Sequence, residues 1–292
     1  MNVLKLLLIL CILIFASVTD FRKREVPNIY IILIILTALI DFRASNMLGS
    51  VISAPFYFAQ KDGKSMGGGD LKLAFALGFS LGLAKSLMTV IFGCVVFITA
   101  GAVCEIANGK KGNYLVFFPS YRFLEDVYEA FEKIQEKEEI EAFPALGHRI
   151  TCVTQSQSMS EKDREEFLNT FEEERKESLL GFCVMGGIFS EGIDLTQDKL
   201  IGAVIVGTGL PQVCREREIL KDYFDQHGQR GFDYAYLYPG MNKVLQAAGR
   251  VIRTDEDRGV ILLLDDRFFD RRYQETFPRE WENQRSCSLG NM

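Results

Sequence analysis

The hydrophobic and polar positions of this chain follow two different patterns, and the pattern changes between Asn108 and Gly112. Before that point, long apolar runs alternate with short polar loops, which is typical of membrane helices. After it, apolar runs of strand length alternate with charged, amphipathic stretches of helix length. The sequence therefore predicts two domains of different class, one over residues 1–108 and one over residues 112–285.

The first pattern contains five apolar runs and predicts an all-α polytopic membrane bundle of about five spans. A spanning helix needs roughly 20 apolar residues, and several of the runs are shorter. The runs cover Val3–Val18, Asn28–Ile40, Met47–Gln60, Leu71–Ala84 and Ser86–Ile106. A cleaved signal peptide is the alternative for the first run, although no small-residue cleavage site precedes a mature domain.

Basic residues set the predicted orientation of this bundle. Residues 1–109 carry 9 Lys+Arg and 6 Asp+Glu, a net charge of +3, and basic residues gather at Arg22–Arg24 and at Lys110 and Lys111. Because positively charged loops stay in the cytosol, we expect the N-terminus outside and the second domain in the cytosol. The expected localisation is the bacterial inner (cytoplasmic) membrane.

Two aspartates, Asp20 and Asp70, then lie at the cytosolic face of the membrane. Acidic residues in membrane helices are costly and are usually functional. Two carboxylates that share a proton can activate a water molecule and protonate a leaving group. Gly67–Gly69, before Asp70, allow a substrate backbone to approach closely. On the residues alone, helix capping at the membrane interface is an equally good interpretation.

The surroundings of both aspartates resemble the small type IV prepilin peptidases. The segments are Asp20-Phe-Arg-Lys-Arg-Glu-Val-Pro27-Asn28 and Met66-Gly-Gly-Gly-Asp70-Leu-Lys72-Leu, and the second resembles the G-x-G-D motif of that family. The resemblance implies that Asp20 and Asp70 form a metal-free catalytic pair, which cleaves the leader of prepilin substrates at the cytosolic face. The zinc-binding cysteine loop of longer family members is absent, so the resemblance does not extend to N-methylation.

In the second half, the alternation of strand-like and helix-like segments predicts an α/β domain with a mainly parallel sheet covered on both faces. Ligands in such folds gather at the carboxyl ends of the strands. We therefore expect a binding edge formed by residues 118–121, 186–194 and 246–253. The predicted strands are Asn113–Phe118, Arg149–Thr154, Leu179–Met185, Leu200–Val206 and Gly259–Leu264.

The last of the three segments carries two arginines on a predicted helix over Lys243–Arg253. Arg250 and Arg253 are three residues apart, so they share one helix face. Two guanidinium groups in this arrangement can bind phosphate oxygens through paired hydrogen bonds. A surface helix stabilised by ion pairs is the alternative.

Together the three segments resemble motifs IV, V and VI of the second motor domain of XPD/DinG-like superfamily 2 ATP-dependent DNA helicases. They read Gly112-Asn-Tyr-Leu-Val-Phe-Phe-Pro-Ser-Tyr121, Gly187-Ile-Phe-Ser-Glu-Gly-Ile-Asp194 and Gln246-Ala-Ala-Gly-Arg-Val-Ile-Arg253. The resemblance implies a RecA-like three-layer fold with two sets of binding residues. The implied nucleotide-binding set is Gln246, Arg250, Arg253, Glu191 and Asp194, and the implied set for single-stranded DNA is Ser120, Tyr121 and Ser190.

The first motor domain of such a helicase has no counterpart in this sequence, which contains no Walker A motif and no D-E-A-H-type box. ATP and Mg would therefore bind the lobe only together with a complementing first motor domain. Residues 110–292 carry 24 Lys+Arg and 33 Asp+Glu, a net charge of −9, which disfavours strong DNA binding by this chain alone. The abrupt change of pattern indicates a fusion of two unrelated proteins, and a membrane-tethered regulator of a helicase is the alternative.

The seven cysteines form no C-x-x-C pair. We therefore expect neither a metal site nor a disulfide framework, and interpret the cysteines as reduced, buried thiols.

Overall fold

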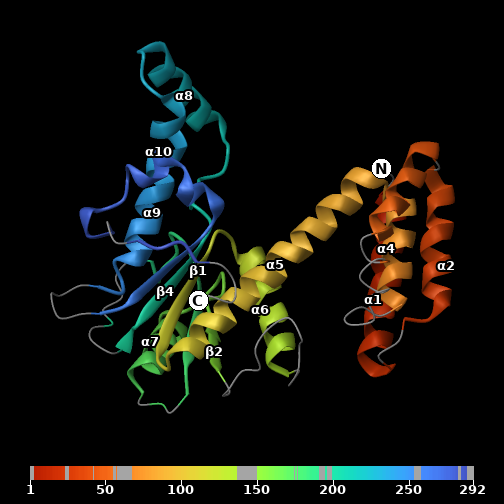
Figure 1. The fold of residues 1–292 in the computed structure, drawn as a ribbon, viewed down its shortest axis with the longest axis horizontal. Helices are drawn as coiled ribbons and strands as arrows, with labels where there is room; N and C mark the ends of the chain where they lie inside the picture. The colour runs from red at the N-terminus through yellow and green to blue at the C-terminus, as the bar shows by residue number, and fades with distance from the viewer. Residues whose placement is uncertain are drawn as a thin grey trace. The chain divides into compact units, whose positions relative to one another are not determined.

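The structure is a computed structural model that describes residues 3–23, 26–41, 43–54, 57, 68–136, 150–173, 175, 177–190, 195, 199–252, 258–281 and 284–287. The chain divides into an N-terminal unit, Met1–Val95, and a C-terminal unit, Val96–Met292. Helix α5 (Leu83–Gly109), which is labelled in Figure 1, begins in the first unit and ends in the second.

The N-terminal unit is helical. Its core is formed by Ile31, Ile34 and Ala76, which bring two helices together. A second contact is made backbone to backbone, because a methyl group added at Gly49 would lie 2.0 Å from the carbonyl oxygen of Gly78. The elements before α5 are α1 (Val3–Lys23), α2 (Asn28–Thr37), η1 (Ala38–Asp41), η2 (Ala44–Ile52) and α4 (Gly68–Leu81).

A buried polar cluster joins α1, α2, η1 and α4 at the end of the unit where α1 begins. The ammonium group of Lys5 lies 3.0 Å from a carboxylate oxygen of Asp41 and donates to the carbonyl oxygen of Ser80 at 2.7 Å. The hydroxyl groups of Ser80 and Thr37 lie 2.8 Å apart. Lys5 is fully buried, so these partners replace the water that its charge would otherwise require.

The expectation of about five membrane spans is wrong. Among the described residues, only α5 is long and apolar enough to cross a membrane. The other apolar helices, Val3–Ser17, Asn28–Asp41 and Leu71–Leu81, are shorter. At 1.5 Å per residue they do not reach across a hydrocarbon core of about 30 Å. The third predicted run, Met47–Gln60, contains the 3-10 helix η2, and much of its remainder lies outside the described residues.

The C-terminal unit contains a five-stranded parallel sheet in the order β2-β3-β1-β4-β5. The parallel α/β class and all five predicted strands are confirmed. Central strand β1 pairs on one side with β3 and on the other with β4, so that Val116 aligns with Phe182 and with Val204. The strands are β1 (Asn113–Phe118), β2 (Thr151–Thr154), β3 (Leu179–Val184), β4 (Gly202–Val206) and β5 (Val260–Leu264).

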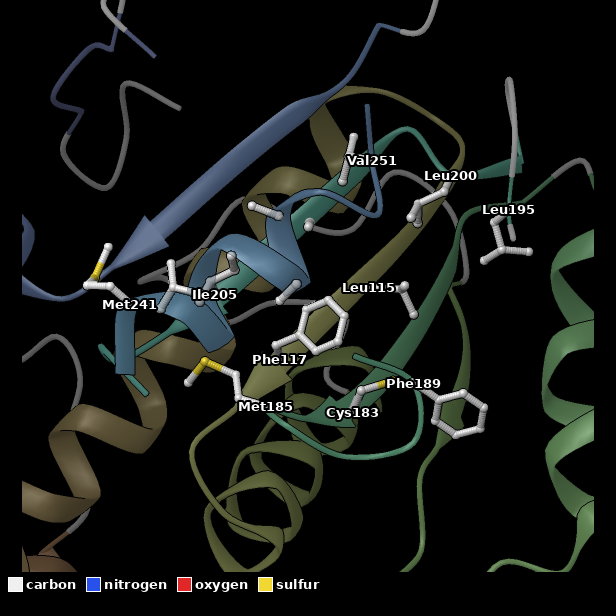
Figure 2. Packing of buried hydrophobic residues seen from close by; sticks show 14 of the residues in the cluster. Leu115, Phe117, Cys183, Met185, Phe189, Leu195, Leu200, Ile205, Met241 and Val251 are labelled. Carbon is white, nitrogen blue, oxygen red and sulfur yellow. The ribbon is translucent and has the colours of Figure 1, made fainter. Parts of the chain in front are cut away.

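Helices cover both faces of this sheet, since successive strand residues point to opposite faces. Leu115 and Phe117 share a core cluster with residues of α7 (Glu161–Glu172) and α9 (Tyr238–Ala248), and Figure 2 shows both side chains together with Met241 of α9. Tyr114, Val116 and Phe118 pack against α6 (Tyr121–Glu136) and the second half of α5. The remaining elements are α6 (Tyr121–Glu136), α7 (Glu161–Glu172), α8 (Arg215–Gln226), the π-helix η4 (Asp233–Leu237), α9 (Tyr238–Ala248), η5 (Asp266–Phe269), α10 (Arg271–Gln274) and η6 (Arg279–Trp281).

The second half of α5 therefore belongs to the core of the C-terminal unit. Its residues Val96, Ala100, Val103 and Ala107 are buried in the same cluster as the central strands. The sheet that this half covers explains its apolar composition. The preceding segment, Leu83–Val95, is only about 20 Å long at 1.5 Å per residue, which is too short to span a bilayer alone.

Candidate functional site

The loops that follow the parallel strands meet at the carboxyl edge of the sheet, where ligands bind in open α/β folds. They contain Ser120 after β1, Gln155 after β2, Gly186–Ser190 after β3 and Gly207–Gly209 after β4. Two of the three predicted binding segments, 118–121 and 186–194, begin at this edge.

Gln155 joins three of these loops through its side-chain amide. Its Nε2 group donates to the hydroxyl of Tyr121 at 2.9 Å, and its Oε1 atom accepts from the backbone N–H of Val184 at 2.9 Å. Gln155 is only 3% exposed, whereas Tyr121 is half-buried. The bridge fixes the tyrosine at the start of α6 relative to the turn that follows β3.

The two predicted serine contacts differ in exposure. Ser120 is exposed, and its hydroxyl accepts from the backbone N–H of Phe123 at 3.3 Å in the first turn of α6. Ser190 is fully buried. Its hydroxyl accepts from Gly186 N–H at 2.9 Å and donates to the Val184 carbonyl at 3.1 Å, so it stabilises the turn after β3.

The predicted helix over Lys243–Arg253 is shorter at its end than expected. Helix α9 ends at Ala248 and Gly249 caps it, so Arg250 follows in a turn. The Nε group of Arg250 donates to the carbonyl oxygen of Gln246 at 3.3 Å. Because the helix does not continue, the expected shared helix face of Arg250 and Arg253 is not formed by α9.

The expectation that residues 246–253 lie at the carboxyl edge is also wrong for the described residues 246–252. Helix α9 starts beside the loop after β4, where a methyl group added at Gly240 would lie 2.7 Å from the Thr208 carbonyl oxygen. Its end leads to Val251, which packs on Gly259 at the amino end of β5. Figure 2 shows Met241 and Val251 at opposite ends of the helix. The helix runs back across the sheet, so the described part of motif VI, Gln246–Ile252, ends at the opposite edge.

Three predicted nucleotide-binding residues, Glu191, Asp194 and Arg253, lie outside the described residues. Gln246 is exposed on α9. The structure therefore brings Ser120 and Tyr121 together at one edge and leaves Arg250 at the other.

Sequence reasoning missed two residues at the carboxyl edge, Gln155 and Lys243. Gln155 directly follows the predicted strand Arg149–Thr154. A polar residue at this position indicates a side chain at the carboxyl edge of the sheet. Lys243 precedes Gln246 by one turn and Arg250 by two turns of helix spacing. Its side chain lies against the backbone of Gly186 and Gly209.

An ion pair closes the end of β5. Arg267 donates to both carboxylate oxygens of Asp265, at 2.8 and 2.7 Å. Burial by itself would raise the pKa of the Asp265 carboxyl, but the hydrogen bonds from Arg267 outweigh burial and hold this pKa below its ordinary value. The Asp265 charge is therefore compensated within the fold.

The predicted aspartates of the N-terminal unit lie on helix ends, Asp20 in the last turn of α1 and Asp70 in the first turn of α4. Thr19 and Tyr30 share a hydrogen bond of 2.9 Å between hydroxyls, and the ammonium of Lys72 donates to Asn28 at 3.0 Å. Both contacts are made near the start of α2. The two aspartate-bearing turns thus reach the same end of α2, while the aspartate side chains lie outside the described part.

All seven cysteines are free, and four of them are exposed, so the interpretation as buried thiols is wrong for those four. The exposed cysteines are Cys11, Cys94, Cys214 and Cys287. Within the described residues, no group of three or more His, Cys, Asp or Glu side chains could hold a metal ion.

A parallel five-stranded sheet covered by helices, with polar loops at its carboxyl edge, places the C-terminal unit in the α/β class. Residues 103–284 match the family described as Helicase C-terminal domain, and the chain belongs to that family. Residues 7–102 match the type IV leader peptidase family. The apolar α5 and this second match give only weak support for membrane association.

Relatives of the chain include helicases from archaea and yeasts. It is 29% identical to a probable ATP-dependent helicase of Methanocaldococcus jannaschii over 57% of this chain and 25% of the relative. It is 27% identical to the ATP-dependent DNA helicase CHL1 of Scheffersomyces stipitis over 63% of this chain and 23% of the relative. An apo XPD structure matches 60% of this chain and 33% of its own, with 23% identity and a TM-score of 0.46. The chain thus spans about a quarter of the length of these curated relatives.

Proposed function

We propose that the C-terminal unit is the second, RecA-like motor lobe of an ATP-dependent DNA helicase, and that it binds single-stranded DNA at the carboxyl edge of its sheet. The family match over residues 103–284 carries this proposal. The exposed Ser120 and the half-buried ring of Tyr121 support the binding edge, because a hydroxyl can contact a phosphate and an aromatic ring can stack on a base.

The nucleotide would bind on another part of the same lobe. Gln246 and Arg250, with Glu191, Asp194 and Arg253, are the residues proposed to contact ATP when a first motor domain supplies the phosphate-binding loop and the Mg ligands. The separation of Arg250 from the carboxyl edge supports separate strand and nucleotide sites. The partners are therefore single-stranded DNA and a complementing first motor domain.

The strand site can be tested with a fluorescent oligo-dT and the full chain in detergent micelles at low salt. We expect weak binding, with a Kd of about 10⁻⁴ to 10⁻⁶ M, because the contacts are largely electrostatic. Tyr121→Ala should weaken binding severalfold, whereas Tyr121→Phe should retain it because the ring is kept.

The matched control is Tyr223→Ala, which removes an exposed tyrosine on α8 that belongs to none of the three predicted binding segments. Absence of any binding by the wild-type chain would overturn the proposed function. Equal effects of Tyr121→Ala and Tyr223→Ala would overturn the assignment of the carboxyl edge.

We further propose that the N-terminal unit is a prepilin leader peptidase that acts through Asp20 and Asp70. The meeting of both aspartate-bearing turns at one end of α2 supports this candidate, together with the family match. The proposed setting is the bacterial inner membrane, with cleavage at its cytosolic face and the C-terminal unit in the cytosol. Prepilin is the proposed substrate.

Cleavage of a membrane-reconstituted prepilin by the full chain tests this second candidate. Asp20→Asn and Asp70→Asn should each abolish cleavage, because the shared-proton mechanism needs both carboxyl groups. Glu105→Gln in α5 is the control and should cleave normally. Unchanged cleavage by either aspartate variant would contradict the proposal.

A further inference from the structure

We propose that Lys243 is a phosphate-binding residue of the carboxyl edge, where its ammonium group binds a backbone phosphate of single-stranded nucleic acid. The inference rests on the proposed strand-binding function and deepens it. Lys243 belongs to none of the three motif segments, so the fold alone brings it to this edge.

The position of the Lys243 side chain follows from its contacts with two glycines. A methyl group added at Gly209 would lie 3.5 Å from Lys243 Cβ, and one added at Gly186 would lie 3.3 Å from both Cδ and Cε. The side chain therefore starts over the loop after β4 and ends over the turn after β3. Both glycines have positive φ, +63° and +71°, so larger residues are disfavoured in the two loops.

The side chain of Lys243 thus crosses the end of β1, because β1 lies between β3 and β4 in the sheet. The residues that leave β1 at this point are Pro119 and Ser120. The ammonium group is carried toward the turn after β3, on the same edge as Ser120 and Tyr121. Lys243 is half-buried, which is typical of a lysine whose methylene groups pack on the protein while its ammonium group remains in contact with water.

The ammonium group has no hydrogen-bond or ion-pair partner within the described part of the chain. A second unpartnered polar group is next to Gly209 in sequence. The hydroxyl of Thr208 is buried, its residue is 1% exposed, and it also has no partner among the described residues. Leaving a buried hydroxyl unpaired is costly. A cation and a hydroxyl donor are both groups that bind phosphate oxygens.

The position of Lys243 favours a backbone phosphate of single-stranded nucleic acid over the phosphates of ATP as its ligand. Arg250, the described arginine proposed to contact ATP, lies seven residues further along the chain, about 10 Å away at helical rise, toward the amino edge of the sheet. Lys243 shares its edge with Ser120 and Tyr121 instead. Gly186 is exposed, so the turn over which the Lys243 side chain ends is open to solvent.

The test measures binding of fluorescent oligo-dT to the full chain in detergent micelles over a range of salt concentrations. Lys243→Met should weaken binding by about five- to tenfold and should lower the slope of log Kd against log salt by about 0.7, because one released counterion is lost. Lys243→Arg should keep the slope. Lys221→Met on α8 is the matched control and should behave as wild type.

A Lys243→Met variant with the salt slope of the wild-type chain would overturn this inference while leaving the proposed strand binding intact. Failure of the wild-type chain to bind would overturn both. Lysine acetylation of the wild-type chain, read by mass spectrometry, provides a direct second measurement. Oligo-dT should protect Lys243 and leave Lys221 unchanged, and protection by ATP and Mg in place of oligo-dT would overturn the assignment to the strand.

Discussion

Gln155 illustrates how one buried side chain can set the geometry of a binding edge. Its amide connects Tyr121 to Val184, and a methyl group added at Gly187 would lie 2.8 Å from Gln155 Nε2. Gly187 is therefore required for the turn to close over the amide. The two predicted binding loops are held together by a residue that belongs to neither.

Replacing Gln155 by Leu should lower the free energy of unfolding of the C-terminal unit by about 1–3 kcal/mol, because a buried backbone N–H loses its acceptor. Trp281 is the single tryptophan of the chain and packs against Phe277 in this unit, so its fluorescence reports the transition in urea. Gln226→Leu, on the exposed end of α8, is the control and should change little. Equal midpoints for the two variants would contradict the role of Gln155.

At the scale of elements, α5 shows why an apolar run does not identify its own environment. The run Ser86–Ile106 satisfies the length and composition expected for a membrane span. In the structure, Val103 is fully buried in the core formed with the sheet, whereas Ile98 on the same helix is 50% exposed. Lipid and a sheet face both favour apolar side chains, so the residues alone could not decide between them.

Val103→Ala should destabilise the C-terminal unit by about 2 kcal/mol, since the deleted methyl groups leave a cavity beneath the sheet. Ile98→Ala, which removes a larger but half-exposed side chain, should change the stability by less than about 0.5 kcal/mol. Both values come from urea unfolding followed by Trp281 fluorescence. If the second half of α5 lay in lipid instead, neither substitution would move that transition.

The direction in which α9 crosses the sheet also depends on how the elements pack together. The sequence indicates a helix that carries Gln246 and Arg250, and in the structure this helix carries Gln246 but ends at Ala248, before Arg250. Since the strands are parallel, the helix that connects β4 to β5 must return across the sheet. Its first turns therefore lie at the carboxyl edge with Lys243, and its end lies at the amino edge with Val251.

The whole molecule joins two family segments, one over residues 7–102 and one over residues 103–284. Helix α5 contains the point where the two matches meet. The C-terminal match therefore begins inside the helix that covers its sheet, so that Val103 and Ala107 belong to the helicase domain.

We expect the purified chain to show no ATP hydrolysis above background, with or without single-stranded DNA. Phosphoryl transfer in this class needs a phosphate-binding loop and Mg ligands from a first motor domain, and the sequence has no Walker A motif. A coupled phosphate-release assay measures this directly. Turnover that is present in the wild-type chain and lost in Arg250→Ala would show this expectation to be wrong.

The five strands, their parallel α/β class and the three helicase-like segments could be predicted from the residues, because strand periodicity and short motifs are local properties of the chain. Three other features depend on the folded structure. It assigned half of an apolar run to a sheet face, separated Arg250 from Ser120 and Tyr121, and brought Gln155 and Lys243 to the binding edge. Each depends on which surfaces meet and in which direction a helix crosses the sheet, and spacing along the chain does not encode either.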